Sequence, residues 1–396
     1  MKLACVVQRY GAGIAGGSER HCREIALRLS ARHDVSVLTT CAADYVTWDN
    51  ELPAGTSVDG AVRVERFPVR RSRRLKAFAD LSDEVFDGPS PEERQRDWFL
   101  ENGPDSPALL DHLRVHGASY DAVLFWTFRY APSFFGVPLV KDRAVLLPTA
   151  EEDRAIDLSV LEEFFQTPAA YLFLTPEEET LVSTRAGRQL RPAATIGMGL
   201  EPASPAGTAA SRPVAVPVSG PFLLYVGRVD RNKGCDTLLE YFADYAAVHP
   251  ELSLVLAGPA KMRIPSHPRV HALGRVSDEV RDALISSATA LVVPSPFESL
   301  SIVLLEAWNR GVPAIVNGLC AVLKGQVRRA NGGLYYRSSA EFTETVEALR
   351  THDDARRALG RQGLAYVERE YRWPIVLARV EALLNQVGKA TRQGHL

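Results

Sequence analysis

Residues 222–234 read FLLYVGRVDRNKG, and this stretch decides how the chain folds. An apolar run leads into Gly227, and Arg228 and Lys233 follow before a helical pattern starts near residue 236. A strand, a glycine turn and a helix in this order are typical of a parallel sheet with crossover helices. Ligands of such sheets bind beyond the carboxyl ends of the strands, so the turn at 227–234 is a candidate binding site.

The same alternation of short apolar runs and helical stretches continues on both sides of this turn. Before it, strands are expected at 3–8, 35–40, 62–69, 122–126, 145–149 and 171–175, with helices at 19–30, 107–116 and 176–186. From it onward, strands are expected at 222–227, 252–257, 270–273, 291–294, 313–317 and 334–336, with helices at 236–248, 278–287, 300–310, 354–370 and 374–387. This pattern predicts an α/β protein with two Rossmann-like, doubly wound parallel-sheet domains.

The composition changes in mid-chain, where residues 201–220 read EPASPAGTAASRPVAVPVSG. Such a Pro-, Ala-, Ser- and Gly-rich stretch is typical of a linker. We therefore predict an N-terminal domain at 1–200, a linker at 201–220 and a C-terminal domain at 221–373, facing each other across a central cleft. A closing helix and tail at 374–396 are expected to cross back to the N-terminal domain.

Charge and cysteine content exclude several classes of protein. The formal net charge is −2, so the chain lacks the global positive field of a non-specific nucleic-acid binder, and no nucleic-acid partner is expected. The five cysteines lie far apart without a Cys-x-x-Cys pair, which favours reduced, buried thiols. Because no run of about 18 uncharged apolar residues occurs, we expect a cytoplasmic protein without a membrane-spanning helix.

A second glycine-rich turn, GAGIAGGSE at 11–19, follows the first expected strand. Gly16 and Gly17 would let the backbone approach an anion while the next helix turns N–H groups toward it. A turn with only a folding role is the alternative. In the turn at 227–234, Arg228 offers a planar fork and Lys233 a point charge, a combination that suits a diphosphate. A solvated, charged loop is the alternative there.

Two carboxylates mark the stretch PSPFESLSIVLLEAWNRGVP at 294–313. If the helix begins near Leu300, Glu298 and Glu306 are separated by roughly 10 Å along its axis. That is about the span from a donor sugar to its nucleoside ribose, and each carboxylate could accept hydrogen bonds from vicinal hydroxyls. A helix with one charged N-terminal residue and one partly exposed Glu is the structural alternative.

Three motifs in this order resemble the retaining family 4 glycosyltransferases of GT-B architecture (glycosyltransferase group 1). They are Gly-Gly-x-Glu at 16–19, Gly-Arg with Lys-Gly at 227–234, and Glu298 followed, after seven intervening residues, by Glu306-Ala307. The resemblance extends over nearly the whole chain and is densest from 222 to 336. It implies a retaining hexosyltransferase-like enzyme that moves a sugar from a nucleotide-diphosphate donor, in surface polysaccharide or glycoconjugate biosynthesis. The acceptor would be a glycan, a lipid-linked sugar or a small molecule, and the oligomeric state stays open.

The resemblance also implies a role for each matching residue. Arg228 and Lys233 would stabilise the departing diphosphate, and Glu298 would contact the donor sugar. Glu306 would bind the ribose hydroxyls of the donor, and Val276 would lie beside its base. The backbone of Gly16 and Gly17 would approach the donor from the first domain. The N–H groups of Ser299, Leu300 and Ser301 would bind the phosphates. Preorganised cations and N–H groups stabilise the charge that develops on phosphate. With no Asp-x-Asp and no metal-spaced His/Cys cluster in the sequence, we expect a metal-independent reaction without a cofactor.

One position departs from the family pattern. The family carries a His in its first domain, and the matching segment here, LLPTAEED at 146–153, has Glu151 in that place. This carboxylate could bond a sugar hydroxyl or take the acceptor proton, so we assign it a catalytic role as a hypothesis. Because of this departure, a nucleotide-sugar-binding protein with altered catalysis is an alternative. A sugar-nucleotide epimerase or a phosphorylase-like enzyme is another.

Two further stretches are candidates for acceptor contacts. Trp126 and Arg129 come at or after a strand end and could line an acceptor pocket, with core packing as the alternative for the aromatic residue. The run RVERFPVRRSRRLK at 63–76 holds seven basic residues. It could hold a lipid-diphosphate acceptor or attach the protein peripherally to the inner face of a membrane, and a solvated loop is the alternative.

Overall fold

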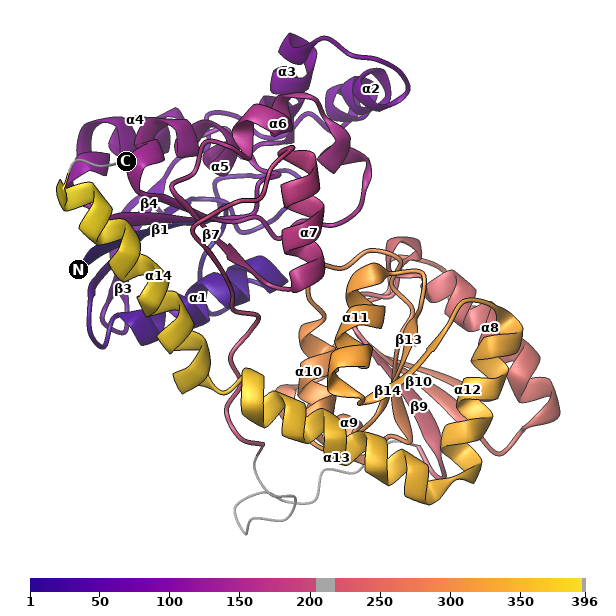
Figure 1. Ribbon diagram of the computed structural model, residues 1–396. Coiled ribbons are helices and arrows are strands. Elements are labelled where there is room, and N and C mark those ends of the chain that lie inside the picture. The colour runs from indigo at the N-terminus through magenta and orange to yellow at the C-terminus, as the bar shows by residue number, and fades with distance from the viewer. Residues whose placement is uncertain (204–217, 394–396) are drawn as a thin grey trace. The chain divides into compact units, whose positions relative to one another are not determined.

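The computed structural model of the protein describes residues 1–203 and 218–393, and Figure 1 shows the arrangement of its elements. It divides into two compact units, Met1–Met198 with Val376–Leu396, and Gly199–Ile375. Of the expected linker at 201–220, residues 204–217 lie outside the described residues.

The first unit is built on an eight-stranded sheet with the order β3-β4-β2-β1-β5-β6-β7-β8. All neighbouring strands are parallel except β3, which pairs antiparallel with β4. The strands are β1 (Lys2–Val6), β2 (Asp34–Thr40), β3 (Gly55–Asp59), β4 (Val62–Phe67), β5 (Ala122–Trp126), β6 (Ala144–Leu147), β7 (Ala170–Phe173) and β8 (Ala193–Thr195). The strand order reverses between β1 and β5, which is where ligands of doubly wound sheets bind.

Helices flank this sheet. They are α1 (Gly17–Leu29), α2 (Leu75–Phe86), α3 (Glu92–Asn102), α4 (Pro107–His116), α5 (Ala131–Gly136), α6 (Val160–Phe164) and α7 (Pro176–Arg185), with short 3-10 turns at Gly117–Ser119, Val137–Arg143 and Arg154–Asp157. The last helix, α14 (Trp373–Gln393), returns to this unit: Arg32 bonds Glu381 at 3.0 Å, and Figure 1 shows its yellow ribbon beside the N-terminus.

The second unit contains a six-stranded, all-parallel sheet with the order β11-β10-β9-β12-β13-β14. Its strands are β9 (Phe222–Val226), β10 (Ser253–Ala257), β11 (Val270–Gly274), β12 (Ala290–Val293), β13 (Ala314–Asn317) and β14 (Gly333–Tyr336). Its helices are α8 (Cys235–Val248), α9 (Asp278–Ser287), α10 (Ile302–Trp308), α11 (Ala321–Ala330), α12 (Ser339–Thr351) and α13 (Asp353–Glu370), with a 3-10 turn at Arg231–Lys233. The order reverses between β9 and β12, the strands that precede the turns at 227–234 and 294–301.

Continuous apolar runs explain why these strands lie at the sheet centres. Every residue of β5 and β12 is buried, as parallel strands covered by helices on both faces require. The predicted fold class, two parallel-sheet α/β domains, is thereby confirmed. All five cysteines are free and buried, as expected. No helix in the described part of the chain is long and apolar enough to span a membrane.

Several elements were not predicted. The antiparallel strand β3 was missed because its sequence, GTSVD, has no alternation of apolar and polar residues. Such alternation marks strands with one buried face, and β3 is almost fully exposed. The helix α10 begins at Ile302 instead of near residue 300, so Glu298 lies in the loop before it. The separation of roughly 10 Å between Glu298 and Glu306 along the axis stays a prediction.

Candidate functional site

The turn at 227–234 is held against the end of β12 by its glycines. Gly234 adopts a left-handed conformation with φ 70°, and a Cβ atom there would lie 2.4 Å from the carbonyl oxygen of Pro294. Real Cβ atoms do not approach backbone so closely, so only glycine fits at this position without moving the chain. The loops that follow β9 and β12 are consequently in backbone contact.

An ion pair joins the same two loops. The Nζ atom of Lys233 lies 2.9 Å from Oε1 of Glu298, and both side chains are largely covered. Asp230 organises the turn, because its carboxylate accepts a hydrogen bond from the Lys233 N–H at 2.9 Å and another from Nε of Arg228. The structure thus brings Arg228, Lys233 and Glu298, three of the predicted site residues, to one edge of the second sheet.

Glu306 lies in α10 and is buried, with 6% of its surface exposed. Its Oε1 is 3.9 Å from Nη2 of Arg281, which comes from the first turn of α9. Burial alone would lower the pKa of Arg281, but Glu306, followed by Asp278 and Asp282, raises it above the ordinary value. Sequence reasoning missed Arg281, since a charged residue in the first turn of a polar helix carries no signal of its own.

The predicted phosphate-binding N–H groups have different environments. Ser299 is half-buried and Leu300 is buried in the loop before α10. The N–H of Ser301 donates to Oε1 of Gln326 at 3.4 Å in a buried position, and its contact with a phosphate stays a prediction. Val276 is half-buried in the loop between β11 and α9.

In the first unit, the turn after β1 exposes Gly16 and Gly17. The carboxylate of Glu19 covers Gly16 so closely that a Cβ atom there would lie 2.0 Å from Oε2. Glu19 is buried and accepts hydrogen bonds from Arg9 at 2.5 Å and from Gln8 at 3.0 Å. A buried ion pair that the sequence did not reveal therefore fixes the conformation of this glycine turn.

Glu151 lies in the turn after β6 and is half-buried. Arg129, in the loop after β5, forms an ion pair with Asp153. Burial would lower the pKa of Arg129, but Asp153 and, more weakly, Glu151 raise it above the ordinary value. Because β5 and β6 are neighbours, the structure places Glu151 and Arg129 together at the carboxyl edge of the first sheet.

Trp126 does not line a pocket, and this prediction is wrong. Its side chain is fully buried, and its indole N–H donates to Nδ1 of His21 at 3.0 Å. The other ring nitrogen of His21 donates to the carbonyl of Gly197 at 2.8 Å. Burial lowers the pKa of His21 to about 4, so this ring is neutral and serves packing.

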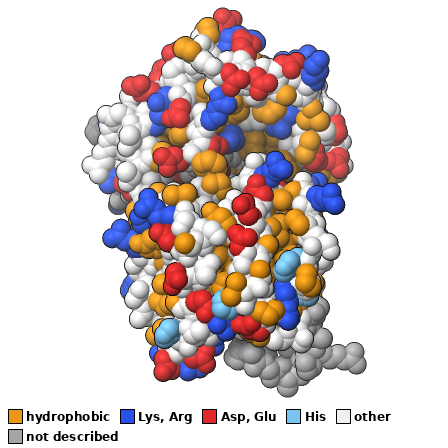
Figure 2. Space-filling view, turned by 90° about the vertical axis from the view of Figure 1, so that its right-hand side faces the viewer, with side chains coloured by type: hydrophobic (Ala, Val, Ile, Leu, Met, Phe, Trp, Pro, Cys, Tyr) orange, Lys and Arg blue, Asp and Glu red, His pale blue; other side chains and the backbone are white. Residues whose placement is uncertain are grey.

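The basic run at 63–76 is partly neutralised within the fold. Arg71 and Arg74 pair with Glu101 at 2.5 and 3.1 Å, and Arg70 pairs with Asp105 at 3.3 Å. On the face shown in Figure 2, basic and acidic side chains alternate without forming a large patch of one sign. Pairing of this kind weakens the attraction to a lipid surface that the run suggested.

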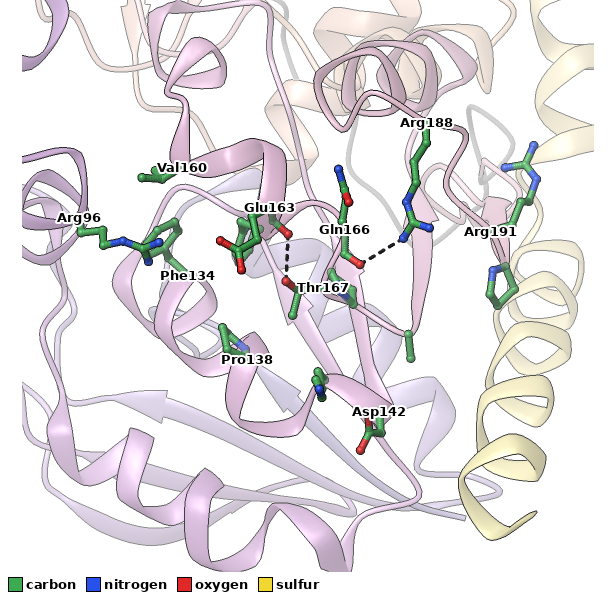
Figure 3. Close-up of a pocket in the computed structure, with 15 residues that line it drawn as sticks. Arg96, Phe134, Pro138, Asp142, Val160, Glu163, Gln166, Thr167, Arg188 and Arg191 are labelled. Carbon is green, nitrogen blue, oxygen red and sulfur yellow. Dashed lines mark hydrogen bonds between the residues drawn. The ribbon is translucent and has the colours of Figure 1, made fainter. Parts of the chain in front are cut away.

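A pocket of about 800 Å³ occurs elsewhere in the first unit, at the amino ends of β6, β7 and β8 (Figure 3). The labelled side chains around it include Arg96, Glu163, Arg188 and Arg191, and Arg188 donates to the carbonyl of Gln166. None of the predicted site residues lines this pocket. It lies at the sheet edge opposite to the one that carries Glu151. Among the described residues, no group of three or more His, Cys, Asp or Glu side chains is arranged to hold a metal ion.

Comparison with known proteins identifies the second unit. Residues 209–365 match the family described as glycosyl transferases group 1. An uncharacterized glycosyltransferase of Methanocaldococcus jannaschii is 30% identical over 128 residues, 29% of this chain and 33% of that protein. The chain thus spans about a third of this relative's length. Glycogen synthase of Mycobacterium tuberculosis is 26% identical over 366 residues, 82% of this chain and 81% of that protein.

Solved structures share the fold of the whole chain. Sucrose-phosphate synthase from Thermosynechococcus elongatus matches with a TM-score of 0.70 at 17% identity, over 98% of this chain and 99% of that one. Anabaena HepE in complex with UDP and glucose matches with a TM-score of 0.68 at 15% identity, over 98% of this chain and all of that one. The two parallel-sheet units have the GT-B fold of these structures.

Proposed function

We propose that this chain, a GT-B protein with a glycosyl transferases group 1 domain at 209–365, transfers a sugar from a nucleotide-diphosphate donor to an acceptor. The observation that carries the proposal is the pair formed by Lys233 and Glu298 at 2.9 Å, with Arg228 tied to the same turn through Asp230. It lies at the strand-order reversal of the second sheet. We further propose a retaining, metal-independent hexosyltransferase of family 4.

A pair of this kind suits the chemistry of the reaction. Loss of a nucleoside diphosphate from a sugar develops negative charge on the phosphates, which fixed cations stabilise. Lys233 and Arg228 are suitable cations, and each is held by a carboxylate. A diphosphate bound at this turn would replace the carboxylate partners of both cations. Glu298 would then be released to accept hydrogen bonds from the donor sugar.

The donor nucleoside would bind farther along the same edge. Glu306 is the group proposed for the ribose hydroxyls, and the contact with Arg281 orients its carboxylate. HepE, a fold relative, has been crystallised with UDP and glucose, which supports a nucleotide sugar as the ligand class. Arg129 and Glu151 in the first unit remain our proposal for acceptor contacts and catalysis. We propose a glycan, a lipid-linked sugar or a small molecule as the acceptor, in surface polysaccharide or glycoconjugate formation.

A binding protein that has lost transfer is the second candidate, favoured by Glu151 at the place of the family's His. Thermal unfolding measured with UDP-, GDP-, ADP- and dTDP-linked sugars identifies the donor, since a ligand of the folded state raises the melting temperature. Release of nucleoside diphosphate from that donor is then followed over time. Stabilisation together with release supports the transferase, and stabilisation without any release supports the binding protein. If no nucleotide sugar shifts the melting temperature, the proposed function is wrong.

A further inference from the structure

A carboxylate outside the proposed catalytic set lies buried behind the turn that carries Glu151. Glu178 is in the first turn of α7 and has no exposed surface. Its side chain lies at the carboxyl ends of the neighbouring strands β6 and β7. Neither the sequence motifs nor the proposed chemistry assigns it a role.

Backbone N–H groups from two loops surround this carboxylate. Oε1 accepts a hydrogen bond from Ala150 at 2.8 Å, and Oε2 accepts one from Leu174 at 2.5 Å. Burial raises the pKa of Glu178 to about 8, while hydrogen bonds from Leu174, Ala150, Thr175 and Thr149 act to lower it. Within the described residues, no Lys or Arg forms an ion pair with Glu178, so peptide N–H groups alone hold it.

The turn that Glu178 holds has an unusual backbone. Thr149 is not a glycine, yet it adopts a left-handed conformation with φ 47°. Such a conformation costs about 1–2 kcal/mol and persists only where the surroundings enforce it. A hydrogen bond from the next residue, Ala150, to Glu178 supplies that constraint, and Glu151 follows directly.

We infer that Glu178 is a positioning residue: its buried carboxylate ties the turn after β6 to the end of β7 and thereby fixes the direction in which Glu151 leaves the sheet. This inference rests on the proposed function, in which Glu151 acts in transfer. Glutamine cannot replace the carboxylate, because its amide nitrogen would face a backbone N–H donor and leave it unpaired. The variant Glu178→Gln therefore removes one of the two ties with little change in volume.

The first test needs no activity. Hydrogen exchange is measured on the peptide segments 146–152 and 172–176 in the wild type, in Glu178→Gln and in Val182→Ala. Val182 is buried in the same helix, so Val182→Ala lowers the stability of the unit without touching the turn. We expect exchange at 146–152 to become at least 10-fold faster in Glu178→Gln than in Val182→Ala. Equal exchange in the two variants would overturn the inference.

The second test is a double-mutant cycle on transfer with Glu151→Gln. We expect Glu178→Gln alone to lower kcat by about 10- to 100-fold with the donor KM nearly unchanged, because misplacement of a reacting group by about 1 Å has that effect. In the Glu151→Gln background, Glu178→Gln should lower kcat by less than 3-fold. Val182→Ala should leave kcat unchanged.

Equal losses from Glu178→Gln in both backgrounds, or full activity in Glu151→Gln, would contradict positioning through Glu151. These results differ from a failure of the proposed function, in which the wild type itself shows neither donor binding nor transfer. In that case the exchange experiment still decides whether Glu178 holds the turn.

Discussion

The Nζ atom of Lys233 and Oε1 of Glu298 lie 2.9 Å apart, although 65 residues separate them in the chain. They meet because β9 and β12 are neighbours in the second sheet and the loops that follow these strands are in backbone contact. The pair keeps a cation and a carboxylate ready in the place where a diphosphate and a sugar are proposed to bind.

Lys233→Met keeps most of the aliphatic stem but removes the charge. We expect kcat for transfer to fall by about 10²- to 10³-fold, since a preorganised group that stabilises transition-state charge is lost. Steady-state kinetics with the donor found by thermal unfolding would measure this. Arg231→Ala, an exposed residue in the same turn, is the matched control and should keep kcat within 2-fold. Equal losses in both variants would mean that Lys233 acts only through the general charge of the loop.

Glu306→Gln tests the proposed ribose contact. We expect the donor KM to rise roughly 10-fold with kcat little changed, because a contact made equally in the ground and transition states affects binding alone. Initial rates over a range of donor concentrations separate the two constants. Glu240→Gln, exposed on α8, should change neither. A fall in kcat at constant KM would instead place Glu306 at the reacting sugar.

Gly234→Ala tests the contact between the two loops. Gly274 shares the left-handed conformation of Gly234, with φ 66° against 70°, but a Cβ atom at Gly274 would meet nothing within 4 Å. Gly274→Ala should therefore cost about 1 kcal/mol of unfolding free energy for conformation alone. Gly234→Ala should cost roughly 2 kcal/mol more, because its Cβ must displace the end of β12. Urea unfolding of both variants gives this difference, and equal costs would refute the contact.

His21 should make the stability of the first unit depend on pH. Its pKa is lowered to about 4 by burial, so between pH 4 and 6.5 the unfolded chain binds a proton that the folded chain does not. The stabilisation is complete above pH 6.5 and is lost as the pH falls to about 4. The difference in unfolding free energy between the wild type and His21→Gln should shrink by about 2–3 kcal/mol from pH 7 to pH 4.5. His352→Gln, at an exposed position, should show no such change.

The fold was predictable because the sequence of a buried parallel strand is a continuous apolar run, as in FLLYV before Gly227. Lys233 and Glu298 could be singled out since each follows such a run. Their contact could not, because β12 neighbours β9 only through a strand order that the chain sequence does not state.

Other failures have equally local causes. Trp126 ends the run AVLFW, in which every side chain is apolar, so alternation could not show which face it occupies. Glu178 looks like an ordinary first-turn helix residue in the sequence, and Glu19 belongs to the Gly-Gly-x-Glu motif without a role of its own. Their importance arises from their surroundings in the fold. Glu19 pairs with Arg9, which follows β1, and Glu178 accepts hydrogen bonds from backbone N–H groups. Such environments exist only after the sheet has formed.

The chain leaves the first unit at Met198 and comes back to it at Val376. During synthesis, the ribosome therefore delivers the second unit whole before the last helix of the first one has emerged. Although N-terminal domains generally fold first, here the C-terminal half can mature on the ribosome while the N-terminal half waits for its closing segment. A nascent chain stalled shortly after residue 375 would carry an unfinished first unit.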